Sequence, residues 1–290
     1  MGELLWDVSP TQEWLGGAPA NFAYMTAVLG DSAIVASRVG NDPRGHEALR
    51  RLNWAGVSVS QVQIDSRYAT GSVAVELDEK GQAKYTIVED VAWDYFEFSS
   101  DWNGLALRAD AVCFGSLAQR SSQSCETIRR FLEATRSQTL IVFDVNLRSP
   151  FYTGEVLTES FKLTDIAKLN DEEMYTVSEL FELPDGTEEE CAKRLLERFD
   201  LKAVCVTRGR RGSLLITSED TFEHSGFNVD VVDTVGAGDA FTAALVHHYL
   251  RGSSLEKISE AANRLGSWVA SQAGATPQVS QSVLEEVVSA

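Results

Sequence analysis

The sequence is poor in cysteine and proline and has no long apolar run. Its four cysteines are scattered over 290 residues without a CxxC pair, which excludes a disulfide framework and a cysteine-rich zinc site and indicates reduced core residues. Only 6 prolines occur and no segment is of low complexity, so a disordered chain is excluded. No apolar run is long enough to cross a bilayer, and no basic region precedes an apolar one near the N-terminus. We therefore expect a cytoplasmic protein without a membrane partner.

Positive charge is also scarce. The chain carries 25 Lys and Arg residues against 43 Asp and Glu residues, a formal net charge of -18 at pH 7. Nucleic acids and anionic membranes bind to basic faces, so this composition excludes both as partners. An anionic ligand would therefore need local positive charge, from a metal ion, from helix N-termini or from a few well-placed Arg or Lys residues.

Most of the chain alternates apolar strands with helices. The length fits one large α/β domain, and we predict a single domain over residues 1–290. From Asp110 onward, strands of continuous apolar residues alternate with helical segments, which indicates a mostly parallel sheet covered on both faces. Ligands on such sheets bind at the carboxyl ends of the strands.

The segment from about 57 to 90 has a different pattern. VSVSQVQI, GSVAVELD and AKYTIVED alternate apolar and polar residues, and Glu79–Gln82 is predicted as a hairpin turn. These features indicate antiparallel strands with one exposed face. We predict a β lid formed mainly by residues 57–90, together with a short segment near residues 8–16.

The stretch DTVGAGDAFTAALVHHYL places small residues before a carboxylate and a buried helix. Gly236, Ala237 and Gly238 form a turn whose free backbone N–H groups, with the helix dipole, favour an anion such as phosphate. Asp239 would repel that anion, unless it accepts a proton from the attacking group. The helix dipole favours its ionised form, so we expect a weak base. An ordinary turn with Asp in the first helical turn is the alternative interpretation.

Two other groups of polar residues could belong to a site. Asp144, Asn146 and Arg148 occupy alternate positions at a strand end and project to one side, although a solvent-exposed strand end would show the same pattern. Asn170 and Glu173 are spaced i and i+3 on a starting helix. They could orient a hydrated magnesium ion, but a capped helix accounts for this spacing equally well.

Two separate motifs resemble the signatures of the PfkB, or ribokinase-like, carbohydrate kinases. One is GGAPANFA, followed by Gly30 and Gly40, and the other is DTVGAGDAFTAALV. This resemblance implies a ribokinase-like three-layer α/β/α fold with a mostly parallel central sheet and a small β-sheet lid. GELLWD, GGAP and FDVNLR are most similar to the fructokinase branch. The chain begins at the glycine that follows the family's first strand, so we expect that central strand to be cut short.

The resemblance also implies roles for individual residues. Asp239 would be the catalytic base, and the backbone of Gly236, Ala237 and Gly238 the anion hole. The residues expected to contact the sugar are Asp7, Gly17 and Asn21, with Asp144 and Arg148 from the strand end. The residues expected at the nucleotide are Asn170, Thr207, Gly209, Gly212 and Asn263. Glu173 would hold Mg²⁺ through water, and Asp233 would lie in a loop for a monovalent cation such as K⁺.

We therefore expect an ATP-dependent sugar kinase that transfers the γ-phosphoryl group to a primary hydroxyl of a ketose, with fructose as the first choice. A 2-keto-3-deoxygluconate kinase, a ribose kinase or a kinase for another sugar remains an alternative. A catalytically silent kinase-like binding protein is the non-enzyme alternative. A dinucleotide oxidoreductase is disfavoured because no GxGxxG follows the first strand. We further expect the lid to close over the sugar and to pair with its copy in a homodimer.

Overall fold

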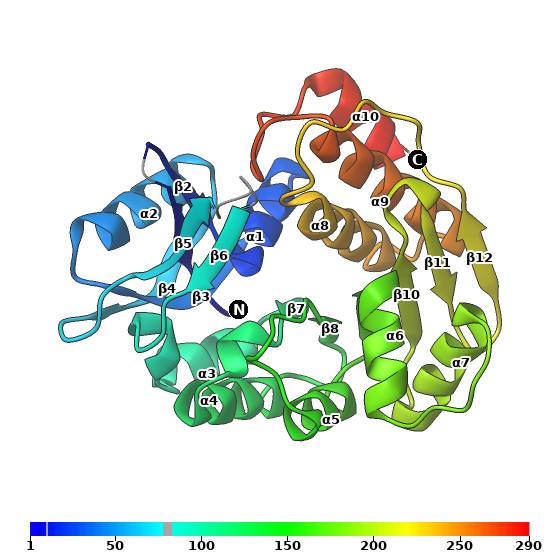
Figure 1. The fold of residues 1–290 in the computed structure, drawn as a ribbon, viewed down its shortest axis with the longest axis horizontal. Helices are drawn as coiled ribbons and strands as arrows, with labels where there is room; N and C mark the ends of the chain where they lie inside the picture. The colour runs from blue at the N-terminus through cyan, green and yellow to red at the C-terminus, as the bar shows by residue number, and fades with distance from the viewer. Residues whose placement is uncertain (10, 78–82, 290) are drawn as a thin grey trace.

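The structure is a computed structural model that describes residues 1–9, 11–77 and 83–289. A six-stranded sheet forms its centre, in the order β12-β11-β10-β9-β8-β7 (Figure 1). The four strands from β7 to β10 are parallel, and β11 is antiparallel to both of its neighbours, β10 and β12. The mostly parallel central sheet is thus confirmed. Its strands are β7 Ala111–Phe114, β8 Leu140–Asp144, β9 Ile166–Asn170, β10 Ala203–Thr207, β11 Ser213–Ile216 and β12 Thr221–His224.

Helices cover both faces of this sheet, because its strands alternate apolar side chains between two cores. On β8, Val142 belongs to one core and Phe143 to the other. The first core packs against α1 Ala18–Val28, α8 Ala237–Tyr249, α9 Leu255–Ala270 and α10 Gln281–Ser289. The second packs against α3 Ser100–Ala106, α4 Ser122–Glu133, α5 Gly154–Lys162, α6 Asp171–Leu180 and α7 Glu188–Phe199. The predicted three-layer α/β/α architecture is confirmed. No helix in the described residues is long and apolar enough to span a membrane.

A separate four-stranded sheet, in the order β2-β1-β5-β6, forms the predicted lid. Its strands are β1 Leu5–Val8, β2 Glu13–Gly16, β5 Gly71–Leu77 and β6 Ala83–Ile87. β1 runs antiparallel to β2 and parallel to β5, and β5 is antiparallel to β6. The predicted turn Glu79–Gln82 lies outside the described residues.

The assignment of 57–64 to the lid is wrong. This segment forms β4 Ser58–Asp65, which pairs in parallel with β3 Ile34–Gly40 in a two-stranded sheet. Apolar side chains from β3 and β4 pack in the same core as those of α2 Pro43–Trp54. A strand with one well-covered face alternates apolar and polar residues just as a lid strand does, so periodicity alone could not distinguish the two.

The segment before β1 lies between the central sheet and β3. The Gly2 nitrogen donates to the carbonyl oxygen of Ala36 on β3 at 3.1 Å, and the Met1 nitrogen donates to the carbonyl oxygen of Cys113 on β7 at 2.5 Å. Residues 1–4 form no strand. β3 and β4 lie outside the six-stranded sheet.

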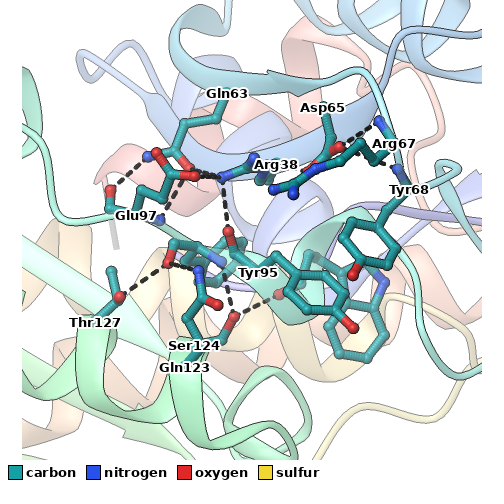
Figure 2. Close-up of polar contacts among 12 residues, drawn as sticks. Arg38, Gln63, Asp65, Arg67, Tyr68, Tyr95, Glu97, Gln123, Ser124 and Thr127 are labelled. Carbon is teal, nitrogen blue, oxygen red and sulfur yellow. Dashed lines mark hydrogen bonds and ion pairs between the residues drawn. The ribbon is translucent and has the colours of Figure 1, made fainter.

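A polar network centred on the buried Arg38 ties the β3–β4 sheet to the rest of the molecule (Figure 2). Arg38 on β3 pairs with Asp65 at 2.7 Å and with Glu97 at 2.9 Å, and it donates to the carbonyl oxygen of Tyr95 at 2.7 Å. Tyr95 ends the short 3-10 helix η1 Ala92–Tyr95. From α4, Ser124 donates to the carbonyl oxygen of Trp93 at 2.8 Å. One buried guanidinium group thus connects β3 and β4 to the chain that continues into α3 and α4.

Candidate active site

The glycine-rich turn before α8 has the geometry of an anion site. Gly236 has φ 79°, and a Cβ atom there would lie 2.6 Å from the carbonyl oxygen of Ala275, so only glycine fits. No side chain caps α8, which begins at Ala237. The Ala237 nitrogen donates to the carbonyl oxygen of Thr234 at 3.2 Å, so the available N–H groups of the first turn are those of Gly238 and Asp239, and together with the helix dipole they favour a phosphate group.

Asp239 lies in this first turn and contacts the second glycine-rich motif. Asn21 of α1 donates from Nδ2 to Asp239 Oδ2 at 2.8 Å, so two motifs about 200 residues apart meet at one carboxylate. Burial raises the pKa of Asp239 to about 7, with a further contribution from the charge of Asp144, while the bond from Asn21 and the charge of Lys168 lower it. The expectation of a weak base is therefore wrong, because desolvation outweighs the helix dipole.

Lys168 places a buried positive charge beside the anion site, and sequence reasoning missed it. Its Nζ atom lies 3.0 and 3.2 Å from the two oxygens of Asp144, and a Cβ atom on Gly238 would lie 2.9 Å from it. Burial alone would lower the pKa of Lys168, but the charges of Asp144, Glu173 and Asp239 raise it. The side chain therefore stays charged. Its signal in the sequence is a lone lysine in the apolar strand IAKLN.

The carboxylate of Asp144 forms an ion pair and a hydrogen bond within the protein. Besides Lys168, its carboxylate accepts a hydrogen bond from Thr242 Oγ1 on α8 at 2.9 Å, and the residue is only 6% exposed. These contacts anchor the N-terminal half of α8 to strands β8 and β9. The expected contact between Asp144 and a sugar stays a prediction.

The other expected sugar residues surround the start of α1 and β1. Gly17 has φ 103°, and a Cβ atom there would lie 2.6 Å from the carbonyl oxygen of Glu3. On β1, burial raises the pKa of Asp7 and the charge of Arg148 partly offsets this. Arg148 is exposed, and Nη1 donates to the carbonyl oxygen of Leu147 at 3.2 Å. Of these residues Asn21 contacts Asp239, and the charge of Arg148 acts on Asp7; their contacts with a sugar stay predictions.

Asn170 and Glu173 form a capping box at the start of α6. Asn170 Oδ1 accepts from the Glu173 nitrogen, and Glu173 Oε2 accepts from the Asn170 nitrogen, both at 2.8 Å. Glu173 Oε1 accepts from the Leu147 nitrogen at 2.9 Å. The capped-helix interpretation is therefore correct.

Glu173 also fits a hydrated magnesium ion held through water, because each of its carboxylate oxygens can still accept a second hydrogen bond. This role stays a prediction. Residues 1–9, 11–77 and 83–289 contain no cluster of three or more His, Cys, Asp or Glu residues suited to direct metal binding.

The expected nucleotide residues follow the end of β10. Thr207 is its last residue, and the 3-10 helix η3 Gly209–Arg211 comes next. Gly212 has φ 81°, and a Cβ atom there would lie 1.9 Å from the carbonyl oxygen of His224, so the turn requires glycine. The neighbouring hollow, with a volume of about 170 Å³, is lined by Arg210, Ser225, Gly226, Phe227, Asn228 and Val229.

Two further candidate site residues, Asn263 and Asp233, form hydrogen bonds within the protein. Asn263 on α9 is buried and donates from Nδ2 to Ser213 Oγ at 2.7 Å and to the Ser259 carbonyl oxygen at 2.8 Å. Asp233 accepts from the nitrogens of Val235 and Gly274 at 3.0 and 3.1 Å, and so joins two loops. Their expected roles at the adenine and at a monovalent cation stay predictions.

Comparison with known proteins identifies the family. Residues 2–281 match the pfkB family carbohydrate kinases. A protein of Pyrococcus horikoshii named as a sugar kinase is 33% identical over 281 residues, covering 93% of this chain and 84% of that protein. The fructokinase of Salmonella typhimurium is 30% identical over 258 residues, covering 85% of this chain and 82% of the relative.

Solved structures have the same fold. The Pyrococcus horikoshii sugar kinase in complex with ATP has a TM-score of 0.83 at 28% identity, covering 99% of this chain and 98% of the other. The Vibrio cholerae fructokinase with fructose, ADP and calcium has a TM-score of 0.84 at 23% identity, covering 99% and 97% of the two chains. The similarity extends over nearly the whole length of each chain, and the described residues bring both glycine-rich motifs to one carboxylate. The chain belongs to the pfkB family of carbohydrate kinases.

Proposed function

We propose that this carbohydrate kinase transfers the γ-phosphoryl group of ATP to a primary hydroxyl of a ketose, with fructose as the preferred acceptor. Family membership makes the protein a phosphotransferase with an alcohol group as acceptor. The observation that carries the finer proposal is Asp239, a carboxylate with a pKa of about 7, bonded to Asn21 at an uncapped helix N-terminus. Fructokinases among the relatives support the choice of fructose.

The site contains the groups that phosphoryl transfer requires. The oxygen of the acceptor hydroxyl forms a bond to the γ-phosphorus, and the bond from that phosphorus to the ADP oxygen breaks. Asp239 accepts the proton that the hydroxyl loses. Positioning and charge neutralisation supply most of the catalysis. The free N–H groups at the start of α8 bind the phosphoryl oxygens, and Lys168 adds a fixed positive charge beside them. Mg²⁺, when bound, neutralises phosphate charge, and Glu173 would hold its water ligands.

The charge balance supports an anionic nucleotide at this position. A protein with a net charge of -18 needs local positive groups. The start of α8 and Lys168 supply them on the phosphate side, and Arg148 supplies one on the sugar side. K⁺ at the loop of Asp233 is a further expectation, supported by a Vibrio cholerae fructokinase solved with fructose, ADP and potassium.

A sugar panel tests the proposal. The purified protein is incubated with ATP and Mg²⁺, and ADP release is measured with fructose, ribose, 2-keto-3-deoxygluconate and other sugars, with phosphorus NMR to locate the phosphate on the product. We expect the highest kcat/KM with fructose and a phosphate ester on a primary hydroxyl. Preference for another sugar would replace fructose in the proposal. No ADP release with any sugar would favour the silent binding protein instead.

A further inference from the structure

Trp14 on β2 is a large aromatic side chain that the proposed phosphoryl transfer does not use. It is 43% exposed, whereas Trp6, Trp93 and Trp102 are buried. A single exposed apolar side chain is common on a protein surface and by itself needs no explanation. The significance of Trp14 therefore depends on which residues lie beside it in the lid sheet.

The two faces of the lid sheet have different surroundings. Trp6 on β1 and its direct partner Leu15 on β2 pack in the core that contains α2, and Trp6 Nε1 donates to the carbonyl oxygen of Arg44 on α2 at 3.1 Å. Directly paired residues share a face of a sheet, and successive residues of a strand point to opposite faces. Asp7 and its direct partner Trp14 therefore lie on the face turned away from α2.

The face that carries Trp14 is turned toward the central body of the molecule. Asp7 pairs with Val73 on β5, and Val73 pairs with Ile87 on β6, so these residues continue the row that Trp14 begins. Ile87 packs against the core that contains α3 and α4. The row from Trp14 to Ile87 thus lies between the lid and the central body.

A short stretch of chain connects this face to the proposed base. A Cβ atom on Gly16, the last residue of β2, would lie 2.6 Å from Asp7 Oδ2. The chain then enters α1, which lies between the lid and α8 (Figure 1), and Asn21 on α1 donates to Asp239 Oδ2 at 2.8 Å. The Cβ atoms of directly opposite residues in an antiparallel pair are about 5 Å apart. The indole ring of Trp14 is therefore within reach of a molecule that binds to Asp7.

We propose that Trp14 is a substrate-contact residue of the acceptor site, whose indole ring packs on the C–H face of a sugar in its ring form. The inference rests on the proposed sugar kinase function and adds an apolar wall to its acceptor site. Sites for small molecules combine aromatic walls with a few placed polar groups, and Asp7 is the polar group beside Trp14. A sugar ring has C–H groups on its faces and hydroxyls at its rim, so this packing removes apolar surface of both partners from water.

Substitutions of Trp14 and of a second exposed tryptophan test this. Trp14→Ala removes the ring, Trp14→Phe keeps an aromatic ring, and Trp54→Ala on α2, where the side chain is 86% exposed, is the matched control. We expect Trp14→Ala to raise KM for the best ketose about 10- to 30-fold with kcat within about 3-fold of the parent, because the ring binds substrate and transition state alike. Trp14→Phe and Trp54→Ala should stay within about 3-fold of the parent, and KM for ATP should not change.

Tryptophan fluorescence reports the contact itself. A sugar that covers a half-exposed indole ring should shift the emission of the parent to shorter wavelength in the absence of nucleotide. The shift should be lost in Trp14→Phe, which keeps most of the activity, and should remain in Trp54→Phe. A shift that is unchanged in Trp14→Phe would overturn the inference.

The outcomes separate this inference from the function on which it rests. A parent that phosphorylates no sugar fails the proposed function, and the inference with it, before any variant is compared. If the parent is active, a KM for the ketose within about 2-fold of the parent in Trp14→Ala would overturn the inference alone. A changed sedimentation mass with an unchanged KM would assign Trp14 to an interface between copies and would also overturn it. ATP affinity and Tm report folding, and should Trp14→Ala unfold, the same comparison with Trp14→Leu, which keeps apolar bulk without a ring, decides.

Discussion

Asp239 shows how strongly the surroundings of a residue decide its chemistry. At the start of a helix a carboxylate is normally favoured in its ionised form. Here burial and the charge of Asp144 raise the pKa of Asp239 to about 7. A base with a pKa near the working pH is well matched to proton transfer, so the burial that disfavours the charge supports the proposal that Asp239 is the base.

The first prediction concerns pH. Below about pH 7 Asp239 becomes protonated and cannot accept the proton of the acceptor, so kcat/KM should fall tenfold for each further unit of acid, about 1.4 kcal/mol per unit. We expect an acid limb with an apparent pKa of about 7 in kcat/KM measured from pH 5 to 9, at constant ionic strength. An acid limb near the ordinary Asp value of about 4 would contradict a raised pKa.

Several residues of the site could be identified from the sequence, and others could not. Asp239, Asn21 and the glycines stand in motifs whose spacing carries a signal. Lys168 is a single charged residue in an apolar strand, and only the packing of distant strands shows what it faces. For Asp144, the alternate spacing with Arg148 indicates that the two side chains project to the same side of the strand. It does not indicate that Asp144 is buried against Lys168 and Thr242.

At the scale of elements, the lid is predicted to move. Its four strands form a sheet separate from the central one, and closure over the sugar would exclude water that could otherwise take the phosphoryl group. We expect amide hydrogen exchange in β1 and β5 to slow when saturating sugar and nucleotide are added together. Strand β4 serves as the internal control because it lies outside the lid. Equal exchange in the free and bound protein would rule out closure.

The β3–β4 sheet should depend on Arg38. Arg38 is 7% exposed and pairs with Asp65, which is 1% exposed. Arg38→Met would leave Asp65 buried without its ion partner, so we expect a loss of roughly 3–5 kcal/mol in the free energy of unfolding. Urea denaturation measures this change.

The exposed Arg50 on α2 is the matched control for Arg38. It pairs with Glu47 at the surface, so Arg50→Met should change stability by only about 0.5 kcal/mol or less. An Arg38→Met variant as stable as Arg50→Met would mean that the network contributes no stability.

At the scale of the whole molecule, the α/β rhythm of the sequence was enough to predict a mostly parallel sheet with helices on both faces. It could not place 57–64, because a strand with one well-covered face looks the same in the lid and beside α2. It also could not show that β3 and β4 form a sheet of their own. Both features depend on which strands pair over long distances in the sequence, whereas the periodicity of apolar residues reflects only which side of each segment is exposed.

The homodimer through the lid stays a prediction at this scale. Trp14 on β2 is 43% exposed, and pairing with a second copy would bury the part of this aromatic side chain that a bound sugar leaves exposed. Sedimentation equilibrium should give about twice the chain mass of 31.8 kDa. A mass equal to that of one chain over the measured concentrations would contradict pairing.

Substitution of Asp239 by Asn tests the sugar kinase mechanism most directly. Asn keeps the size of the side chain and its ability to lie in a first helical turn, but it cannot take up the proton of the acceptor. We measure turnover, ATP affinity and Tm for Asp239→Asn beside the parent, with the sugar that gives the fastest ADP release. Turnover should fall ~10²- to 10⁴-fold, while ATP affinity and Tm stay near parental values. Near-parental turnover would contradict the assignment of Asp239 as the base, and a collapsed Tm would indicate that Asp239 serves the fold instead.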